Sequence, residues 1–75
     1  MPHVVIKLMS GRSEPQKRKL AELVTKAVME GAGCGEESVS VAIEDVATGE
    51  WSKEVYNLEI KPNLELLYKK PGYTA

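Results

Sequence analysis

The residue of this chain best suited to chemistry is Pro2, because removal of Met1 leaves it as an N-terminal secondary amine. Proline is small enough as a second residue for the initiator methionine to be removed. An unperturbed α-amino group has a pKa near 7.7–8.0, and apolar surroundings or a neighbouring cation lower that pKa because they disfavour the charged form. Since a general base works best with a pKa close to the working pH, Pro2 is a candidate catalytic base.

Other groups that commonly carry catalysis are scarce. The chain has one histidine, His3, and one cysteine, Cys34, and neither has an evident partner along the sequence. The sequence shows no ligand spacing typical of a metal site and no glycine-rich phosphate loop. We interpret His3 as a structural or interface residue and Cys34 as a free thiol. We expect chemistry that uses neither a metal nor an organic cofactor.

Two strands with one long helix between them are predicted to hold Pro2 in place. Residues 3–9 are rich in β-branched side chains and precede a Ser-Gly turn, whereas residues 38–46 alternate apolar with polar side chains. Between them, Ser13 and Gln16 have the spacing of a capping box, and apolar residues recur at helical spacing until Gly33. This order favours a right-handed β-α-β crossover with parallel strands.

The last third of the chain is predicted to be helical from Trp51 to Lys70. Ser52 is a possible cap, Pro62 marks a break or restart, and a Pro-Gly pair after Lys70 ends the helix.

The small size of the chain predicts that it associates with itself. A chain of 75 residues buries only about 60% of the surface that its unfolded form exposes. A single cysteine excludes an internal disulfide, and two strands alone do not make a stable sheet. The predicted fold is therefore a single α/β domain over residues 1–75. It is a small β-α-β subunit with two parallel strands, a long amphipathic helix and a C-terminal helical segment, completed by oligomerisation.

Charge and hydropathy narrow the classes of partner. Ten basic and eleven acidic residues leave no basic excess for binding nucleic acid. No uninterrupted apolar segment is long enough to span a membrane, and the N-terminus shows no leader pattern. We expect a cytoplasmic protein without nucleic-acid or membrane partners.

Several short motifs together resemble the 4-oxalocrotonate tautomerase family. The chain begins Met-Pro-His and a short apolar strand, followed by Gly-Arg-Ser at 11–13 and Gln-Lys at 16–17 opening an amphipathic helix. SVSVAIEDV at 38–46 and TGEW at 48–51 are similar to the family's second strand and following loop, and LLYKKPGY at 66–73 resembles the tail of its enteric phenylpyruvate-type branch. The resemblance covers most of the chain. It implies a β-α-β subunit that pairs as a dimer and, in some branches, assembles further into a hexamer.

The resemblance also implies roles for particular residues. Pro2 matches the proline that shuttles a proton between carbon and oxygen of an enol or dienol α-keto acid. Arg12 matches an arginine that binds a substrate carboxylate, and Trp51 matches an aromatic residue that walls the pocket and lowers the pKa of the amine. Two plainer interpretations stay open: Arg12 as a solvated residue before a helix, and Trp51 as a packing residue.

Ser40 departs from the family pattern. The members that process dicarboxylates carry a second arginine at this point of the second strand, and its absence removes one contact for a dicarboxylate. We therefore expect a substrate with one carboxylate, such as phenylenolpyruvate. Ser40 either offers the substrate a hydrogen bond or simply faces solvent.

Two other functions stay open at this stage. One is a relative that uses Pro2 for hydration or dehalogenation of a short unsaturated acid, with Glu50 or Glu44 activating water. The other is a catalytically idle oligomeric binding module. For the assembly itself, a homodimer is the first expectation and a hexamer the second.

Overall fold

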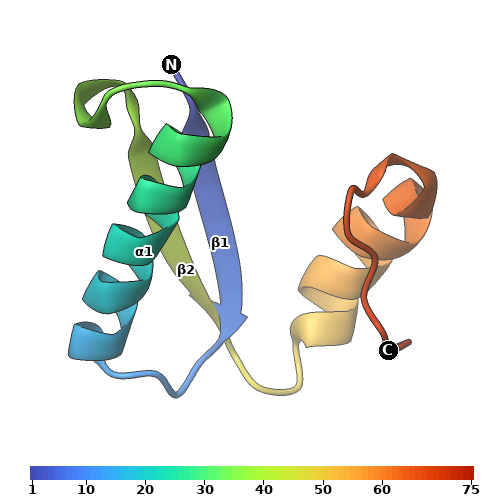
Figure 1. Cartoon of the computed structure of the whole chain (residues 1–75). Helices are drawn as coiled ribbons and strands as arrows, with labels where there is room; N and C mark the ends of the chain where they lie inside the picture. The colour runs from blue at the N-terminus through green and yellow to red at the C-terminus, as the bar shows by residue number, and fades with distance from the viewer.

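A computed structural model, which describes all 75 residues, contains the predicted strand, helix and strand in that order. Strand β1 (His3–Met9) is followed by helix α1 (Glu14–Ala32) and strand β2 (Ser40–Val46). The two strands pair in parallel, with His3 opposite Ser40 and Met9 opposite Val46. Helix α1 lies along one face of this sheet (Figure 1). The predicted β-α-β unit and its parallel strands are confirmed.

Helix α1 begins and ends where the sequence predicts. The Ser13 side chain accepts a hydrogen bond from the Gln16 backbone N–H at 3.2 Å, and the Gln16 side chain accepts one from the Ser13 backbone N–H at 2.9 Å. These two bonds satisfy N–H groups that a helix start otherwise leaves unpaired. At the other end, Gly33 adopts φ 68° and its N–H bonds back to the Met29 carbonyl, a conformation that favours glycine.

An ion-pair cluster fastens α1 to the second strand. Lys17 Nζ lies 2.8 Å from Asp45 Oδ2 and 2.9 Å from Glu14 Oε1. The hydrogen bond to Asp45, followed by the one to Glu14, raises the pKa of Lys17 above its ordinary value. The hydrogen bond from Lys17 in turn lowers the pKa of Glu14. The cluster joins the first turn of α1 to the end of β2.

The second strand begins two residues later than predicted. Residues Glu36–Ser38 form one turn of 3₁₀ helix, η1, instead of the start of β2. The Ser38 backbone N–H donates to the Gly35 carbonyl at 3.2 Å, and its hydroxyl donates to the same carbonyl at 3.0 Å. Because Ser38 closes this turn, its N–H is not free for the sheet.

The C-terminal segment is shorter and less regular than the predicted helix. Its first part, η2 (Ser52–Ile60), is wound as a π-helix, and its second part, η3 (Lys61–Leu66), as a 3₁₀ helix. Trp51 already has helical backbone angles and no side chain caps this start, so the predicted capping role of Ser52 is wrong. The helix also ends at Leu66 instead of Lys70.

The proline explains the irregular second half of this segment. Pro62 lacks an N–H and breaks the helical ladder, as predicted. Asn63 next to it leaves the helical region, at φ −116° and ψ 17°. The Asn63 side-chain amide donates to the Glu59 carbonyl at 2.9 Å, so that carbonyl stays paired. Leu67 is already extended, and the chain continues as a tail without regular structure.

The core of a single chain is incomplete. Only Val46, Val55 and Tyr56 are buried; Val46 ends β2, and the other two belong to η2. The face of the sheet opposite α1 leaves Val5 48% exposed. The radius of gyration is 13.8 Å, whereas a compact domain of this length has about 11 Å. No helix of the chain is both long and apolar enough to cross a membrane.

Candidate active site

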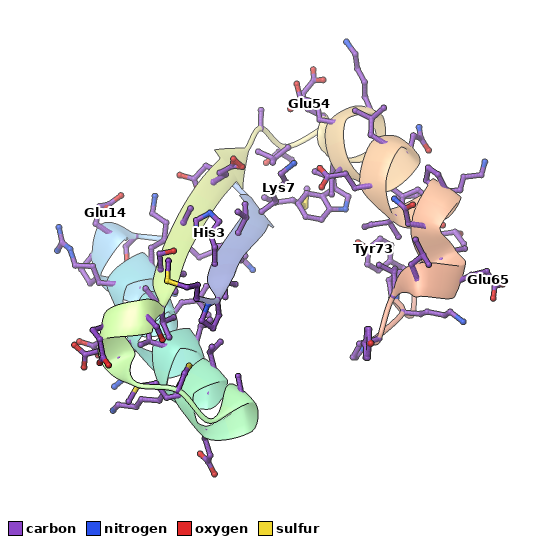
Figure 2. The ribbon with its side chains drawn as sticks, turned by 90° about the horizontal axis from the view of Figure 1, so that it is seen from above. His3, Lys7, Glu14, Glu54, Glu65 and Tyr73 are labelled. Atoms are coloured by element: carbon purple, nitrogen blue, oxygen red, sulfur yellow. The ribbon has the colours of Figure 1, made fainter.

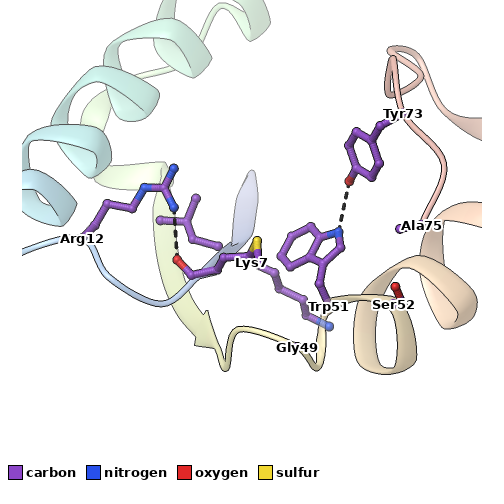
Figure 3. Close-up of a pocket in the computed structure, with 9 residues that line it drawn as sticks. Lys7, Arg12, Gly49, Trp51, Ser52, Tyr73 and Ala75 are labelled. Atoms are coloured by element: carbon purple, nitrogen blue, oxygen red, sulfur yellow. Dashed lines mark hydrogen bonds between the residues drawn. The ribbon is translucent and has the colours of Figure 1, made fainter.

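A pocket of about 560 Å³ lies between the C-terminal end of β1 and the C-terminal segment (Figure 3). Its walls are the end of β1 from Lys7 to Met9, then Arg12, the loop that carries Gly49 and Trp51, and the tail. Pockets for small ligands have volumes of roughly 300–1,000 Å³ and mostly apolar walls with a few charged groups. This pocket fits that description.

Arg12 stands at one side of the pocket, just past the end of β1. Its Nη1 donates a hydrogen bond to the Met9 carbonyl at 3.1 Å. This bond uses one of the five N–H groups of the guanidinium and leaves the others free for a ligand. Gly11 before it has φ 129°, a conformation that side chains rarely adopt, so glycine is needed for the turn that presents Arg12.

Trp51 forms the aromatic side of the pocket. Its indole N–H donates to the Tyr73 hydroxyl at 3.0 Å. The Tyr73 ring lies against the ring of Tyr56, with centroids 5.9 Å apart and planes at 40°. Gly49, at φ 97°, makes the turn that brings Trp51 back toward β1. Trp51 and Tyr73 therefore form an aromatic wall on the side of the pocket away from Arg12 (Figure 3), and the buried ring of Tyr56 supports Tyr73 from behind.

Lys7 adds a second cation to the pocket. It points from β1 toward the C-terminal segment (Figure 2) and forms an ion pair with Glu59 of η2. The hydrogen bond to Glu59, with the nearby carboxylates of Glu44 and Glu54, raises the pKa of Lys7 above its ordinary value. Lys7 therefore stays charged at neutral pH and ties the C-terminal segment to the sheet.

Pro2 and Ser40 lie together at the opposite end of the sheet. The Ser40 backbone N–H donates to the Pro2 carbonyl at 3.2 Å. The Ser40 hydroxyl is hydrogen-bonded to His3 Nδ1 at 2.6 Å and is exposed. Pairing with β2 thus fixes the position of Pro2, as the sequence predicts.

The structure does not bring the two halves of the predicted site together in one chain. Arg12 and Trp51 line one pocket, whereas Pro2 lies at the start of β1. A strand of seven residues separates its ends by roughly 20 Å, at about 3.3 Å per residue. Figure 1 shows the N-terminus at the far end of β1 from the turn that leads into α1. The expectation that Trp51 stands beside Pro2 therefore fails within a single chain.

Sequence reasoning missed Lys7 and Tyr73. Lys7 is an ordinary charged residue in a strand, and only its predicted position two residues before Met9 on the same face could have placed it near the pocket. Tyr73 belongs to the tail motif that resembles the enteric branch, but the path of an irregular tail cannot be derived from its residues. Both depend on how the C-terminal segment turns back.

A parallel β-α-β unit with a guanidinium and an aromatic wall at one end of its sheet defines a class of small α/β subunits. Comparison with known families assigns the chain within that class. The model of the family described as "Tautomerase enzyme" matches residues 2–56. The chain belongs to the tautomerase family, and because its relatives are named tautomerases, it is an isomerase.

Individual relatives extend this match. The chain is 41% identical to a probable tautomerase of Xylella fastidiosa (strain 9a5c) over 73 residues, which is 97% of this chain and 89% of that one. It is 38% identical to tautomerase PptA of Cronobacter sakazakii over 74 residues, which is 97% of both chains. The alignments to these two relatives extend beyond residue 56 and so take in part of the C-terminal segment.

Solved structures show the same fold. A 4-oxalocrotonate tautomerase isozyme from Methylibium petroleiphilum superposes with a TM-score of 0.65 at 46% identity, over 67% of this chain and 81% of that one. YwhB, described as a homologue of 4-oxalocrotonate tautomerase, gives a TM-score of 0.60 at 46% identity, over 61% of this chain and 75% of that one. The predicted resemblance to the 4-oxalocrotonate tautomerase family is confirmed.

Proposed function

We propose that this protein is a cytoplasmic tautomerase that interconverts the enol and keto forms of a monocarboxylate α-keto acid such as phenylenolpyruvate. The observation that carries the proposal is the pocket with Arg12 at one side and the aromatic wall of Trp51 at the other. A ligand with one carboxylate and one apolar end matches these two sides. Ser40, where dicarboxylate-processing relatives carry an arginine, offers no second cation, and the charge of Lys7, the other cation of the pocket, is already paired with Glu59.

The proposed reaction needs one base that also serves as an acid. The carboxylate of the substrate binds the guanidinium of Arg12, which offers parallel N–H groups to two oxygens. The free amine of Pro2 accepts the proton of the enol hydroxyl as the carbonyl forms. The electron pair of the C=C bond then takes a proton from the Pro2 ammonium at the adjacent carbon. The amine ends unchanged, and no oxidant or reductant is consumed.

We propose that a second copy of the chain supplies the missing half of this site. An antiparallel arrangement of two β1 strands about a two-fold axis would bring Pro2 of the partner subunit to the pocket that holds Arg12 and Trp51. Such an isologous interface forms two equivalent sites. A homodimer is the smallest assembly that does this, and a hexamer would contain several such pairs. Sedimentation of a stable monomer at working concentration would rule out both.

The exposed surface of the single chain supports association. Its accessible area is 5662 Å², whereas a compact monomer of this mass exposes roughly 4,500 Å². The excess, about 1,100 Å², is comparable to the roughly 800 Å² that each partner buries in a standard interface. Leu23, Leu58 and Leu66 remain at least half exposed in one chain and are available for such burial.

The hydratase or dehalogenase alternative has no support from the pocket. Neither Glu44 nor Glu50 lines it, so no carboxylate from these two positions is placed to activate water there. A catalytically idle binding module would assemble normally and show no turnover of an enol substrate.

The test of the proposed function compares the same protein with and without Met1. With Met1 attached, the nitrogen of Pro2 is an amide and has no basic lone pair. Protein made with and without a methionine aminopeptidase inhibitor is identical except for Met1, which intact mass verifies. We expect ketonisation of phenylenolpyruvate by the processed form to exceed that of the Met1 form by at least about 100-fold, the lower end of general acid–base effects. Equal rates would refute the role of Pro2.

A further inference from the structure

The wall of the pocket is partly built by the C-terminal tail. The tail starts at Leu67, where the backbone becomes extended, and returns so that Tyr73 lines the pocket. The match to the family model ends at residue 56, so this part of the wall lies outside the segment that defines the family. The proposed catalytic and carboxylate-binding residues, Pro2 and Arg12, both lie within that segment.

Tyr73 is fixed by two contacts and still presents its ring to the pocket. Its hydroxyl accepts the indole N–H of Trp51 at 3.0 Å, and its ring packs on Tyr56, which is only 5% exposed. An indole N–H can only donate, so in an apolar pocket it needs an acceptor such as this hydroxyl. Tyr73 itself remains 47% exposed, so much of its surface is open to a ligand.

Tyr73 lies on the side of the pocket where the apolar end of a bound acid would lie. Figure 3 shows Arg12 and Tyr73 on opposite sides of the pocket, with Trp51 between them. A carboxylate held by Arg12 directs the rest of its molecule toward the two aromatic rings. A phenyl group at the other end of the acid has more apolar surface to place against these rings than a methyl group has.

We propose that Tyr73 is a specificity-determining residue that selects acids with an aromatic or large apolar group over acids with a small one. It acts in two ways: its ring extends the aromatic wall, and its hydroxyl holds the indole of Trp51 in the orientation that the wall requires. This inference rests on the proposed function for the identity of the ligand class. It assigns to the tail a role in choice of substrate, separate from the proton transfer by Pro2.

The test measures binding directly, because Trp51 is the only tryptophan of the chain and its fluorescence reports on the pocket. The probes are phenylpyruvate and pyruvate, which share the carboxylate and keto group and differ in the phenyl ring. The variants are Tyr73→Phe, which removes only the hydroxyl, and Tyr73→Ala, which removes the wall. Tyr68→Ala is the matched control, since Tyr68 lies in the same tail, is fully exposed and does not line this pocket.

We expect Tyr73→Phe to weaken binding of phenylpyruvate about 2- to 10-fold, the range for one hydrogen bond. Tyr73→Ala should weaken it by about 10-fold or more through loss of buried aromatic surface, and should shift the Trp51 emission to the red as water reaches the indole. Binding of pyruvate should change less than about 2-fold in both variants, because the carboxylate contact remains. Tyr68→Ala should leave both affinities as they are.

Four outcomes would overturn the inference. Three concern the variants: equal weakening of the two ligands by Tyr73→Ala, unchanged phenylpyruvate binding in that variant, or the same loss in Tyr68→Ala. The fourth is failure of the wild-type protein to bind phenylpyruvate. If the wild-type protein binds phenylpyruvate selectively but does not ketonise phenylenolpyruvate, the proposed function fails while the role of Tyr73 stands. Thermal unfolding of each variant confirms that the comparison is made on folded protein.

Discussion

A mixing experiment tests whether the site is shared between two chains, since Pro2 and Arg12 lie at opposite ends of β1. Two variants are made separately: Pro2→Ala, which lacks the proline amine, and Arg12→Ala, which lacks the carboxylate contact. Each homodimer then carries the same defect in both of its sites. Loss of a hydrogen bond to a charged group costs about 1.5–3 kcal/mol, so Arg12→Ala should lower kcat/KM about 10- to 150-fold. Loss of the secondary amine of Pro2 should lower kcat/KM at least about 100-fold.

The expected recovery on mixing follows from the position of the two residues. If a site takes Pro2 from one chain and Arg12 from the other, a mixed dimer has one site with both residues intact and one with neither. Random exchange of chains makes about half of the dimers mixed, and half of their sites are intact, so about a quarter of the wild-type rate should return. If both residues of a site came from one chain, no mixed dimer would contain an intact site and no activity would return.

The assay is ketonisation of phenylenolpyruvate after the two variants are unfolded together in urea and refolded. The control is each variant refolded alone at the same total concentration. A mixture no more active than the average of the two controls would refute the shared site, provided that mass spectrometry of the intact assemblies shows mixed dimers. Such a result would also require Pro2 to reach Arg12 within one chain, a movement over most of the length of β1.

Two further predictions concern stability. Ser13→Ala should lower the free energy of unfolding by about 1 kcal/mol because it removes the cap of α1. Ser52→Ala should show no such loss in urea unfolding, since no side chain caps the start of η2. Equal losses in the two variants would contradict the conclusion that Ser13 caps its helix and Ser52 does not. The second prediction concerns Lys7, whose pKa is raised in the folded chain by its ion pair with Glu59. The stabilisation from this pair is fully present below the ordinary pKa of lysine, 10.5. It is lost as pH rises through the raised pKa of the folded chain. Glu59→Gln should abolish this alkaline loss in circular dichroism measured against pH, and a variant with the wild-type profile would show that the pair does not contribute.

The β-α-β unit could be predicted from the sequence because its signals are local. The capping box of Ser13 and Gln16, the terminating Gly33 and the β-branched run of β1 each depend on residues within a few positions of one another. The start of β2 was predicted two residues early because alternation alone does not reveal that the Ser38 hydroxyl closes a turn on Gly35.

The C-terminal segment was harder to predict because its structure depends on distant contacts. Its helical character and the break at Pro62 follow from residue types, but its π-helical winding and early end do not. The packing of Tyr56 on Tyr73 and the ion pair of Lys7 with Glu59 join residues far apart in sequence. The periodicity of the chain carries no information about such pairs.

The candidate site was predicted in part. Arg12 and Trp51 were identified through the family resemblance, and the structure places them in one pocket. The separation of Pro2 from that pocket could have been foreseen, because a strand of seven residues keeps its two ends apart. Lys7 and Tyr73 could not be placed in the pocket beforehand, since the position of each there depends on the path of the C-terminal segment.

The shared site constrains the length of β1 more strongly than its sequence. The number of residues in β1 sets the distance, within each chain, between the amine before the strand and the guanidinium after it. In a shared site, this distance determines whether the amine of one chain reaches the guanidinium of the other. Deleting one residue would shorten that distance by about 3.3 Å and would also turn every later side chain to the other face, Lys7 included. Divergence within the family should therefore change the residues of this strand while keeping their number, and insertions should collect in the tail, where Tyr73 approaches the pocket from outside the sheet.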